Sequence, residues 1–271
     1  MKYLLDNSIR LRLLQKLGLE MNENRFNNMG KIYAQFRPCY AQEFIGYLYS
    51  RVGLDKNSVI ADIGSGTGIL TRQLLEMGSR VFAVEPNTDM RSVAEADLGG
   101  FSGFVSVSGS AENTTLSDCS VDFITVAQAF HWFDMQRFKA ECRRLLKPGG
   151  KVVLVWNSRD RTCELVREND AVNKKYCPKF DGFSGGLRGA DGDSDLKDFF
   201  AGDCEVKAFR NDLSFDEQGF IGRNLSSSYA PKDVDEHYHD YITELKALYE
   251  KFSRNGQLFM PNVTRSYAGR A

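Results

Sequence analysis

A short apolar run that ends in a glycine-rich turn constrains this chain more than any other segment. Val59–Ile63 is almost continuously apolar, as expected for a strand buried on both faces of a parallel sheet. Gly64, Gly66 and Gly68 follow at every second position, and a helical pattern over residues 69–77 comes next. Such glycines permit a tight turn and leave no side chains where a ligand would lie against the main chain. The segment therefore predicts a ligand-binding loop between a buried strand and a helix.

Strand and helix patterns alternate from about residue 57 to 157. Besides the first pair, the patterns predict strands at Arg80–Val84, Phe104–Val107, Val121–Ala127 and Lys151–Trp156, and helices at Thr88–Leu98 and Met135–Leu146. Asn87 or Thr88 is placed to cap the first of these helices, and residues 147–150 (Lys-Pro-Gly-Gly) to end the second. This alternation implies right-handed β-α-β crossovers and a three-layer α/β domain.

The alternation is lost after residue 158. Residues 181–195 are rich in glycine and aspartate, which predicts a loop. Their acids do not fall at the positions of a calcium-binding loop, so no metal site is expected there. Glu205–Leu213 and Gly256–Tyr267 are predicted strands. Asp235–Phe252 is predicted to be an amphipathic helix whose apolar stripe faces a core.

The spacing of the glycines distinguishes between classes of cofactor. A dinucleotide-binding loop has the pattern Gly-x-Gly-x-x-Gly, which would require glycine where Ile69 stands. Asp62 suits a ligand with a positively charged amino group and would repel a pyrophosphate. Glu85 closes the next strand, where a carboxylate can accept hydrogen bonds from a ribose diol. Together these residues favour S-adenosylmethionine (SAM) over a dinucleotide.

Five motifs in this order resemble those of the class I SAM-dependent methyltransferases. They are Asp62–Gly68, Glu85-Pro86, Gly109–Glu112, Gln128–Trp132 and Leu146–Gly150. The resemblance is closest to the small-molecule group near the trans-aconitate and quinone-biosynthesis methyltransferases, and it covers residues 29–157 well. It implies a three-layer, Rossmann-like α/β fold with a seven-stranded sheet, mostly parallel with an antiparallel last strand. Residues 29–271 would form this domain, with substrate-side insertions around 160–200 and 215–252, and residues 1–28 would be an N-terminal helical extension.

The resemblance also implies which residues hold SAM. Asp62 and the loop backbone would hold the methionine part, Glu85 the ribose, Met90 the adenine face, and residues 110–112 the adenine edge. The residues expected to bind the cofactor are Tyr33, Arg37, Asp62, Gly64, Ser65, Gly66, Gly68, Glu85, Pro86, Met90, Ser110, Ala111, Glu112, Gln128 and Ala129.

Candidates for the substrate side are fewer. His131 stands at a strand's carboxyl end and can deprotonate a hydroxyl or an amine, but it can equally order the loop by hydrogen bonding. Trp132, Arg223 and Tyr229 are candidates for contact with the acceptor. Arg37 can instead pair with a carboxylate, either on the cofactor or on an acidic substrate.

These features predict an enzyme that transfers a methyl group from SAM to an oxygen, nitrogen or carbon of a small molecule, such as a carboxylate or hydroxyl. Two alternatives stay open: an NAD-dependent oxidoreductase, and a SAM-binding protein without catalysis. No metal cofactor is expected, because the six cysteines and three histidines are not at metal-ligand spacing.

Composition limits the partners and the compartment. The net charge is −1, with 35 Lys and Arg against 36 Asp and Glu, which gives no support to nucleic-acid binding. No run of 18 apolar residues predicts a membrane span, and the N-terminus lacks the pattern of a secretory signal. Unpaired, reduced cysteines are typical of the cytoplasm. We therefore expect a cytoplasmic monomer or homodimer that acts on a small molecule.

Overall fold

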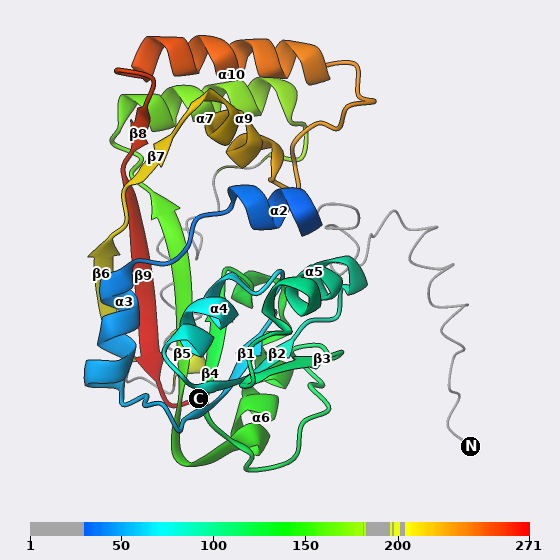
Figure 1. The fold of residues 1–271 in the computed structure, drawn as a ribbon, viewed down its shortest axis with the longest axis vertical. Helices are drawn as coiled ribbons and strands as arrows, with labels where there is room; N and C mark the ends of the chain where they lie inside the picture. Colours follow the sequence, from blue (N-terminus) through cyan, green and yellow to red (C-terminus); the bar gives the residue numbers. More distant parts are fainter. Residues whose placement is uncertain (1–29, 181, 183–195, 197, 201–203) are drawn as a thin grey trace.

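The computed structural model describes residues 30–180, 182, 196, 198–200 and 204–271, with the backbone alone for residues 31–33. Its centre is a seven-stranded sheet in the order β3-β2-β1-β4-β5-β9-β6 (Figure 1). The strands are β1 (Val59–Ile63), β2 (Arg80–Val84), β3 (Phe104–Val107), β4 (Val121–Ala127), β5 (Leu146–Arg159), β6 (Cys204–Arg210) and β9 (Asn262–Gly269). Strands β1 to β5 pair in parallel, and β9 runs antiparallel between β5 and β6. The predicted mixed sheet, whose last strand is antiparallel, is confirmed.

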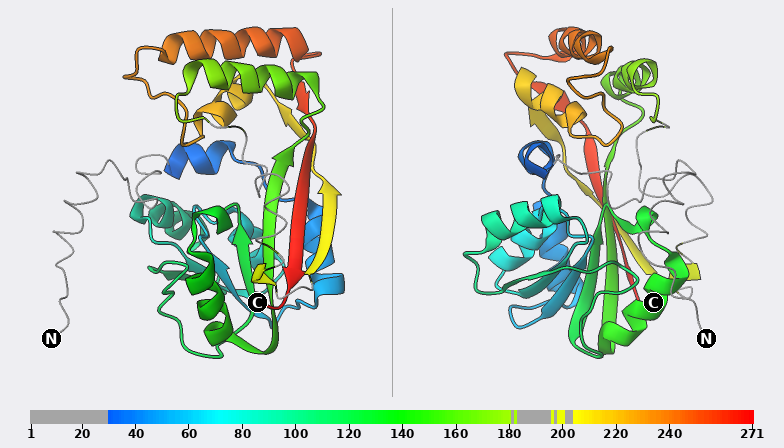
Figure 2. Two further views of the ribbon diagram at one scale, coloured as in Figure 1. Left: turned by 180° about the vertical axis from the view of Figure 1, so that it is seen from behind. Right: turned by 90° about the vertical axis from the view of Figure 1, so that its right-hand side faces the viewer.

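Helices cover both faces of this sheet, as the edge-on view in Figure 2 shows. One face carries α6 (Met135–Leu145), and the other carries α3 (Gln42–Tyr47), α4 (Ile69–Glu76) and α5 (Thr88–Leu98). A short π-helix, η2 (Leu48–Val52), continues α3, and a 3₁₀ turn, η3 (Phe130–Trp132), follows β4. Along β5, Val152, Leu154 and Trp156 pack on the α6 side, whereas Val153 and Val155 pack on the other. This period of two is that of a strand buried on both faces.

Both helices that flank the glycine loop region begin with a side-chain cap, and the one at Asn87 was predicted. The Asn87 side chain accepts a hydrogen bond of 2.9 Å from Met90 N at the start of α5, and Asp134 accepts one of 3.1 Å from Arg137 N at the start of α6. Each cap satisfies a backbone N–H that has no partner within the helix. Helix α5 thereby begins directly after Glu85 and Pro86, beside the glycine loop.

A second, smaller lobe stands beyond the carboxyl ends of the strands. It consists of α7 (Glu164–Tyr176), α9 (Glu217–Leu225), α10 (Tyr238–Phe252) and a two-stranded sheet of β7 (Leu213–Phe215) and β8 (Leu258–Met260). These elements enclose a core of their own. Helix α2 (Gly30–Phe36) lies between the lobe and the sheet domain, in contact with α9 and α5 (Figure 1).

The lobe corrects part of the sequence-based prediction. No helix was predicted between residue 158 and Asp235, but α7 and α9 are regular helices in this range. The single strand predicted over Gly256–Tyr267 is two strands in different sheets, with Pro261 between them. The strand predicted over Glu205–Leu213 divides in the same way, since β6 ends at Arg210 and β7 begins at Leu213. The polypeptide passes from sheet to lobe at both breaks, and a local pattern does not reveal this change of partner.

Residues 147–150 were predicted to be a turn but lie within β5. The register between β4 and β5 shifts there, between Val121 and Phe123, and Gly149 has a φ of 86°. The segment is thus an irregularity inside a longer strand. The predicted loop at 181–195 and the extension at 1–28 lie outside the described residues.

Within the described residues, no helix is both long and apolar enough to cross a membrane. Nor does this part of the chain contain a group of three or more His, Cys, Asp or Glu side chains that could hold a metal ion.

Candidate functional site

The glycine loop joins β1 to α4 at the carboxyl edge of the sheet. All three glycines have positive φ, with 66° at Gly64, 58° at Gly66 and 82° at Gly68. A methyl group added at Gly64 would lie 2.7 Å from the Cβ of Ala129, and one at Gly68 would lie 2.5 Å from Leu98. Nothing stands within 4 Å of the same position at Gly66. The outer glycines therefore permit close packing, whereas the middle one borders open space.

Asp62 connects the elements on either side of this loop. The carboxylate is 1% exposed. One oxygen accepts a hydrogen bond of 2.6 Å from Thr71 of α4, and the other accepts one of 2.8 Å from Thr125 of β4. Asp62 and Thr125 are register partners on neighbouring strands, so their side chains point to the same face of the sheet. Burial raises the pKa of Asp62 to about 6, although these hydrogen bonds lower it. Both oxygens are engaged inside the protein, so this side chain shapes the loop.

Glu85 joins the glycine loop to the end of β2. Its Oε2 accepts a hydrogen bond of 2.9 Å from Gly66 N, and its Oε1 accepts one of 2.8 Å from Asn87 N. The Arg91 guanidinium donates to the carbonyl oxygens of Glu85 and Pro86 and so fixes this turn. An ionised carboxylate has about four acceptor sites. It can therefore accept further hydrogen bonds from a ligand beside Gly66.

Two hydroxyl groups of the loop add to its binding capacity. Ser65 Oγ and Thr67 Oγ1 are shielded from solvent and make no hydrogen bond with any described residue. Buried hydroxyls without partners are uncommon and often mark a ligand or water that would complete them. Ser65 was among the predicted residues, and Thr67 was missed. Its place between two glycines of the motif could have indicated it.

The predicted adenine-side residues lie at the start of α5 and in the turn that follows β3. Met90 is 3% exposed at the start of α5. Ser110 and Asn113 exchange backbone hydrogen bonds, and this closes a tight turn around Ala111 and Glu112. The Glu112 carboxylate accepts a hydrogen bond of 2.9 Å from Asp134 N. Glu112 thus connects this turn to the segment that contains His131.

The segment after β4 forms the other side of the loop. Gln128 has a φ of 59°, a conformation that is rare for residues other than glycine and is often found at functional sites. Its side chain donates a 3.0 Å hydrogen bond to Asn157 O of β5, which holds it in place. His131 is exposed, and its ring centroid lies 4.5 Å from that of Trp132, which is half-buried. His131 is therefore accessible to a substrate.

The remaining predicted residues belong to the lobe side of the site. Tyr33 stands on α2, and its side chain lies outside the described part of the structure. Arg37 follows α2 and donates a 3.0 Å hydrogen bond to Ser226 O. Arg223 is buried on α9, and Tyr229 packs on Phe180 with ring centroids 4.8 Å apart. The predicted set thus divides between the sheet edge and the lobe, with α2 between them.

Sequence reasoning missed Arg159, which ends β5. Its Nε and Nη2 atoms are closed off from solvent. Burial lowers the pKa of its guanidinium, and the nearby Tyr229 raises it. A charged residue at the end of this strand, three positions after the buried run 152–156, could have indicated the position, since parallel strands present functional groups at their carboxyl ends.

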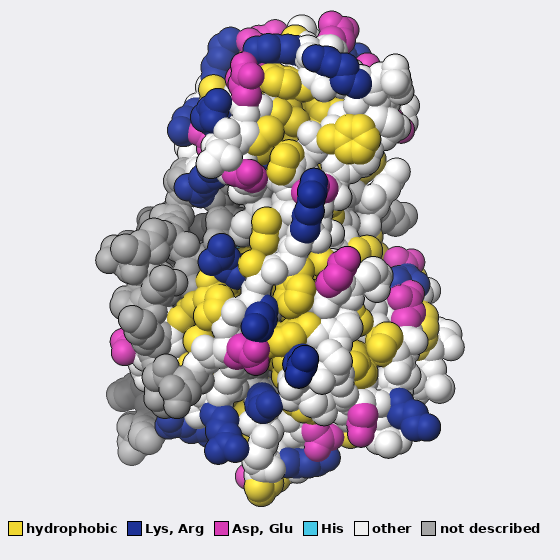
Figure 3. Space-filling model, turned by 90° about the vertical axis from the view of Figure 1, so that its left-hand side faces the viewer, with side chains coloured by type: hydrophobic (Ala, Val, Ile, Leu, Met, Phe, Trp, Pro, Cys, Tyr) yellow, Lys and Arg dark blue, Asp and Glu magenta, His cyan; other side chains and the backbone are white. Residues whose placement is uncertain are grey.

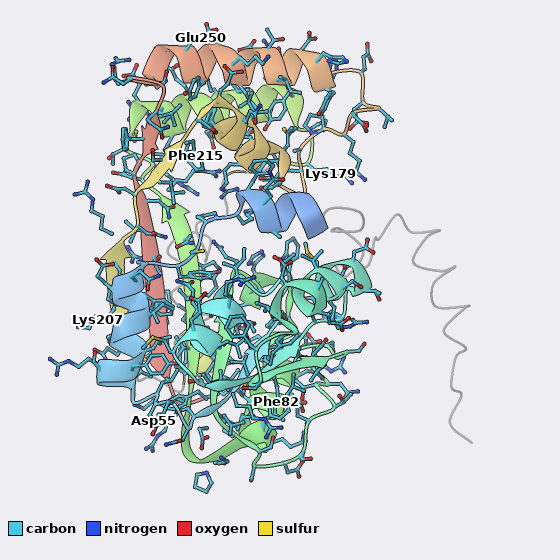
Figure 4. All side chains as sticks on the ribbon, viewed as in Figure 1. Asp55, Phe82, Lys179, Lys207, Phe215 and Glu250 are labelled. Atoms are coloured by element: carbon cyan, nitrogen blue, oxygen red, sulfur yellow. The ribbon has the colours of Figure 1, made fainter. Side chains whose placement is uncertain are left out.

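A cavity of about 390 Å³ lies beside Arg37. Residues 35–39 form one wall, and residues 211–215 with Gly219 form the other. Figure 4 shows Phe215, one of its lining residues, where the lobe joins the sheet domain. The volume of the cavity is within the range of small-molecule sites.

Comparison with known proteins identifies the sheet domain. The family model described as "Methyltransferase domain" matches residues 61–154. Residues 61–154 form a methyltransferase domain. The match begins inside β1 and ends inside β5, so the methyltransferase domain includes the glycine loop, Glu85 and the segment after β4.

The curated relatives of this domain are named as methyltransferases. An uncharacterized methyltransferase of Mycobacterium tuberculosis is 42% identical over 136 residues, which cover 50% of this chain and 53% of that protein. A methyltransferase-like protein of Schizosaccharomyces pombe is 32% identical over 145 residues, with 53% of this chain and 56% of that protein covered. The chain thus spans about half the length of the curated relatives it matches.

Solved structures extend the likeness to most of the chain. A candidate type II methyltransferase from Anaeromyxobacter dehalogenans superposes with a TM-score of 0.59 at 23% identity, and the match covers 87% of this chain and 98% of that one. At this identity the likeness shows the fold alone. The fold is that of the class I SAM-dependent methyltransferases.

Proposed function

We propose that this chain is an enzyme that transfers a methyl group from SAM to a small-molecule acceptor. The observation that carries the proposal is the geometry around Gly66. Open space borders this residue, its N–H is bonded to Glu85, and Ser65 and Thr67 supply hydroxyl groups beside it. This arrangement fits a ligand that combines a ribose diol with a charged amino-acid part.

The same geometry supports SAM over a dinucleotide. A pyrophosphate needs N–H groups and a positive potential, whereas Gly66 N is already bonded to a carboxylate, and Asp62 adds a second acid beneath the loop. When bound, SAM supplies a methyl group on a positively charged sulfur, which is a good leaving group. The protein must then align the acceptor with that methyl group and exclude water, which can lower a barrier by roughly 7–11 kcal/mol.

The cofactor-binding roles proposed for the predicted residues follow their positions. Glu85 binds the ribose hydroxyls, and Met90 and the 110–112 turn surround the adenine. Gly64, Ser65, Gly66 and Gly68 contact the methionine part, with Gln128 and Ala129 on its other side. Pro86 shapes the turn after Glu85. Tyr33 on α2 and Arg37 after it are proposed to contact the cofactor, and Asp62 acts indirectly by holding α4 and β4 around the loop.

On the acceptor side, His131 is proposed as a general base, because it is exposed beside Trp132 at the end of β4. Trp132, Arg223 and Tyr229 are proposed to line the acceptor. We further propose residues 29–271 as one domain with substrate-side insertions, residues 1–28 as an extension, and a cytoplasmic monomer or homodimer that does not bind nucleic acid.

Calorimetric titration of the full chain with S-adenosylhomocysteine (SAH), the product of SAM, tests the cofactor. We expect SAH to bind and NAD⁺ not to bind. Binding of NAD⁺ without SAH would overturn the proposal in favour of an oxidoreductase. Incubation with methyl-labelled SAM and a panel of small acids, alcohols and amines tests catalysis. SAH binding without turnover of any compound would instead favour a SAM-binding protein.

A further inference from the structure

The backbone between α2 and α3 is bonded to side chains of other elements. Cys39, Tyr40 and Ala41, which we call the strap, belong to no helix or strand. Each polar backbone atom from Cys39 O to Ala41 N is nevertheless hydrogen-bonded to a side chain from elsewhere in the fold. Tyr40 and Ala41 are buried, and buried backbone groups outside regular structure need such partners. The position of the strap therefore depends on particular side chains.

Gln73 binds the middle of the strap in both directions. Its Oε1 accepts a 3.0 Å hydrogen bond from Tyr40 N, and its Nε2 donates a 2.9 Å hydrogen bond to Tyr40 O. Gln73 is 4% exposed on α4. It stands two residues after Thr71, whose bond to Asp62 fixes α4 against β1. The strap is thus placed relative to the helix that follows the glycine loop.

Two asparagines bind the start of the strap. Cys39 O accepts hydrogen bonds of 3.1 Å from Asn157 Nδ2 and of 2.9 Å from Asn211 Nδ2. Asn157 belongs to β5, and Asn211 directly follows β6. The carbonyl oxygen of Asn157 also accepts the 3.0 Å hydrogen bond from Gln128, which precedes the 3₁₀ turn beside the glycine loop. Asn157 therefore connects the strap to the other side of the candidate cofactor site.

A buried hydroxyl group binds the end of the strap. Thr264 Oγ1 on β9 accepts a 3.1 Å hydrogen bond from Ala41 N and donates a 2.6 Å hydrogen bond to Asn157 Oδ1. Thr264 is 0% exposed, so water cannot replace this hydroxyl without a change in packing. Removing it would leave a buried N–H without a partner, which is costly. Thr264 and Asn157 thus act on the strap together.

Helix α2 extends from the strap towards the first turn of α5. Gly30, at the far end of α2, lies so close to α5 that an added methyl group would be 3.0 Å from Asp89 O. Helix α5 begins directly after Glu85 and Pro86, and Figure 1 shows α2 between α5 and the lobe. One end of α2 therefore lies beside the candidate cofactor site, and the strap fixes the other end.

We propose that Gln73, Asn157 and Thr264 are positioning residues for the cofactor. By holding the strap they keep α2 against α5, and they raise the affinity for SAM without contacting it. Only molecules in which α2 is correctly placed bind the ligand fully, so the apparent affinity follows the populated fraction of that arrangement. The proposal rests on the proposed function, in which Tyr33 on α2 and Arg37 after it contact the cofactor.

The bonds to the strap are those of uncharged side chains. Gln73, Asn157, Asn211 and Thr264 supply all of them. On the face in Figure 3, Lys and Arg side chains are interspersed with Asp and Glu, so no surface of one sign adds to these bonds there. Salt screens interactions between exposed charges and has little effect on buried neutral hydrogen bonds. The contribution of the strap to cofactor affinity should therefore be independent of salt concentration.

Thr264 offers the sharpest test, because its hydroxyl can be removed with little change of shape. Thr264→Val should weaken SAH binding by about tenfold, since α2 would be correctly placed in a smaller fraction of molecules. Thr264→Ser keeps the hydroxyl and should restore most of the affinity. Gln73→Met loses both bonds to Tyr40 and should behave like Thr264→Val. Calorimetric titration of the full chain with SAH at low and high salt measures these affinities.

Tyr49→Phe is the matched control. Tyr49 OH is hydrogen-bonded to Leu74 O, next to Gln73 on α4, and to Ser79 Oγ, so this variant loses bonds to α4 but none to the strap. Urea unfolding should show a loss of stability for Tyr49→Phe and Thr264→Val alike. SAH affinity should fall for Thr264→Val and stay unchanged for Tyr49→Phe.

Amide hydrogen exchange without ligand reports on α2 directly. We expect faster exchange in residues 30–36 of Thr264→Val and Gln73→Met than in Tyr49→Phe. The proposal is overturned if Tyr49→Phe weakens SAH binding equally, if Thr264→Ser is as weak as Thr264→Val, or if exchange in residues 30–36 is unchanged. Failure of SAH to bind the unmodified chain would count against the proposed function instead, and the exchange experiment would still show whether these side chains hold α2.

Discussion

At the scale of single residues, Gly66 and Glu85 carry most of the chemical argument. Gly66 combines a positive φ with open space, and Glu85 holds its N–H. The positive φ at position 66 favours glycine there, whereas the Glu85 carboxylate supplies a hydrogen-bond acceptor. These two requirements can be separated by substitution.

Gly66→Ala should reduce both stability and cofactor binding. A left-handed conformation costs a residue with a Cβ roughly 1–2 kcal/mol, and the new methyl group would occupy the space proposed for the ligand. Gly256→Ala is the control, because Gly256 has a similar φ of 71° and nothing within 4 Å. Urea unfolding should show a similar loss for both variants, whereas calorimetry should show weaker SAH binding for Gly66→Ala alone. An equal effect on SAH binding would contradict the assignment of this space.

Glu85→Gln should weaken SAH binding by about 10- to 100-fold, because hydrogen bonds from the ribose to a charged acceptor contribute about 1.5–3 kcal/mol. Glu76→Gln is the matched control, since Glu76 is exposed at the end of α4. Calorimetric titration of both variants checks the prediction. Unchanged affinity in Glu85→Gln would remove the ribose-binding role.

At the scale of elements, α6 is fixed to the loop before β4 by a buried carboxylate. Glu141 on α6 accepts hydrogen bonds of 2.9 Å from Thr114 N and 2.6 Å from Thr114 Oγ1, and Arg144 contacts the same carboxylate. Burial raises the pKa of Glu141, but Arg144 and Thr114 outweigh this effect and lower it to about 2. Glu141 thus stabilises the folded protein when it is ionised.

This pKa predicts how stability depends on pH. The contribution of Glu141 is fully present above its ordinary pKa of about 4.5 and is lost as the pH falls towards about 2. Glu141→Gln should lower the unfolding free energy by about 1.5–3 kcal/mol at pH 7 and by less at pH 3. Urea unfolding at both pH values measures this difference. Glu250→Gln on the outer face of α10 is the control (Figure 4), and a pH-independent loss in Glu141→Gln would contradict the prediction.

At the scale of the whole molecule, α2 joins the lobe to the methyltransferase domain. The Phe36 ring lies so close to α9 that a methyl group added at Gly222 would approach it to 2.6 Å. At its other end, a methyl group at Gly30 would lie 3.0 Å from Asp89 O of α5. Helix α2 therefore packs tightly against both parts.

Gly222→Ala should displace α2 from α9. We expect faster amide hydrogen exchange in residues 30–36 and weaker SAH binding, because the elements above the glycine loop would no longer be held in place. Gly46→Ala on α3 is the control, since nothing stands within 4 Å of that position. Hydrogen exchange that is the same in both variants would show that this contact does not control α2.

The sequence by itself determined the parallel part of the sheet and its glycine loop. A strand buried on both faces needs a continuous apolar run, and a turn with positive φ needs glycines at fixed positions. Both patterns are local, because each depends on only a few consecutive residues. The candidate site residues at strand ends could be predicted because the carboxyl ends of parallel strands meet at one edge of the sheet. Several assigned side chains proved to have internal partners: Asp62 bonds Thr71 and Thr125, Glu112 bonds the start of α6, and Gln128 bonds the backbone of β5.

Only the tertiary structure decided the lobe and its contacts with the sheet domain. Strands β7 and β8 leave the main sheet because they pair with each other, and sequence periodicity does not encode the choice of partner. Cys39 and Asn157 are 118 positions apart in sequence, yet a hydrogen bond of 3.1 Å joins them, and only the folded chain brings such distant residues within bonding distance.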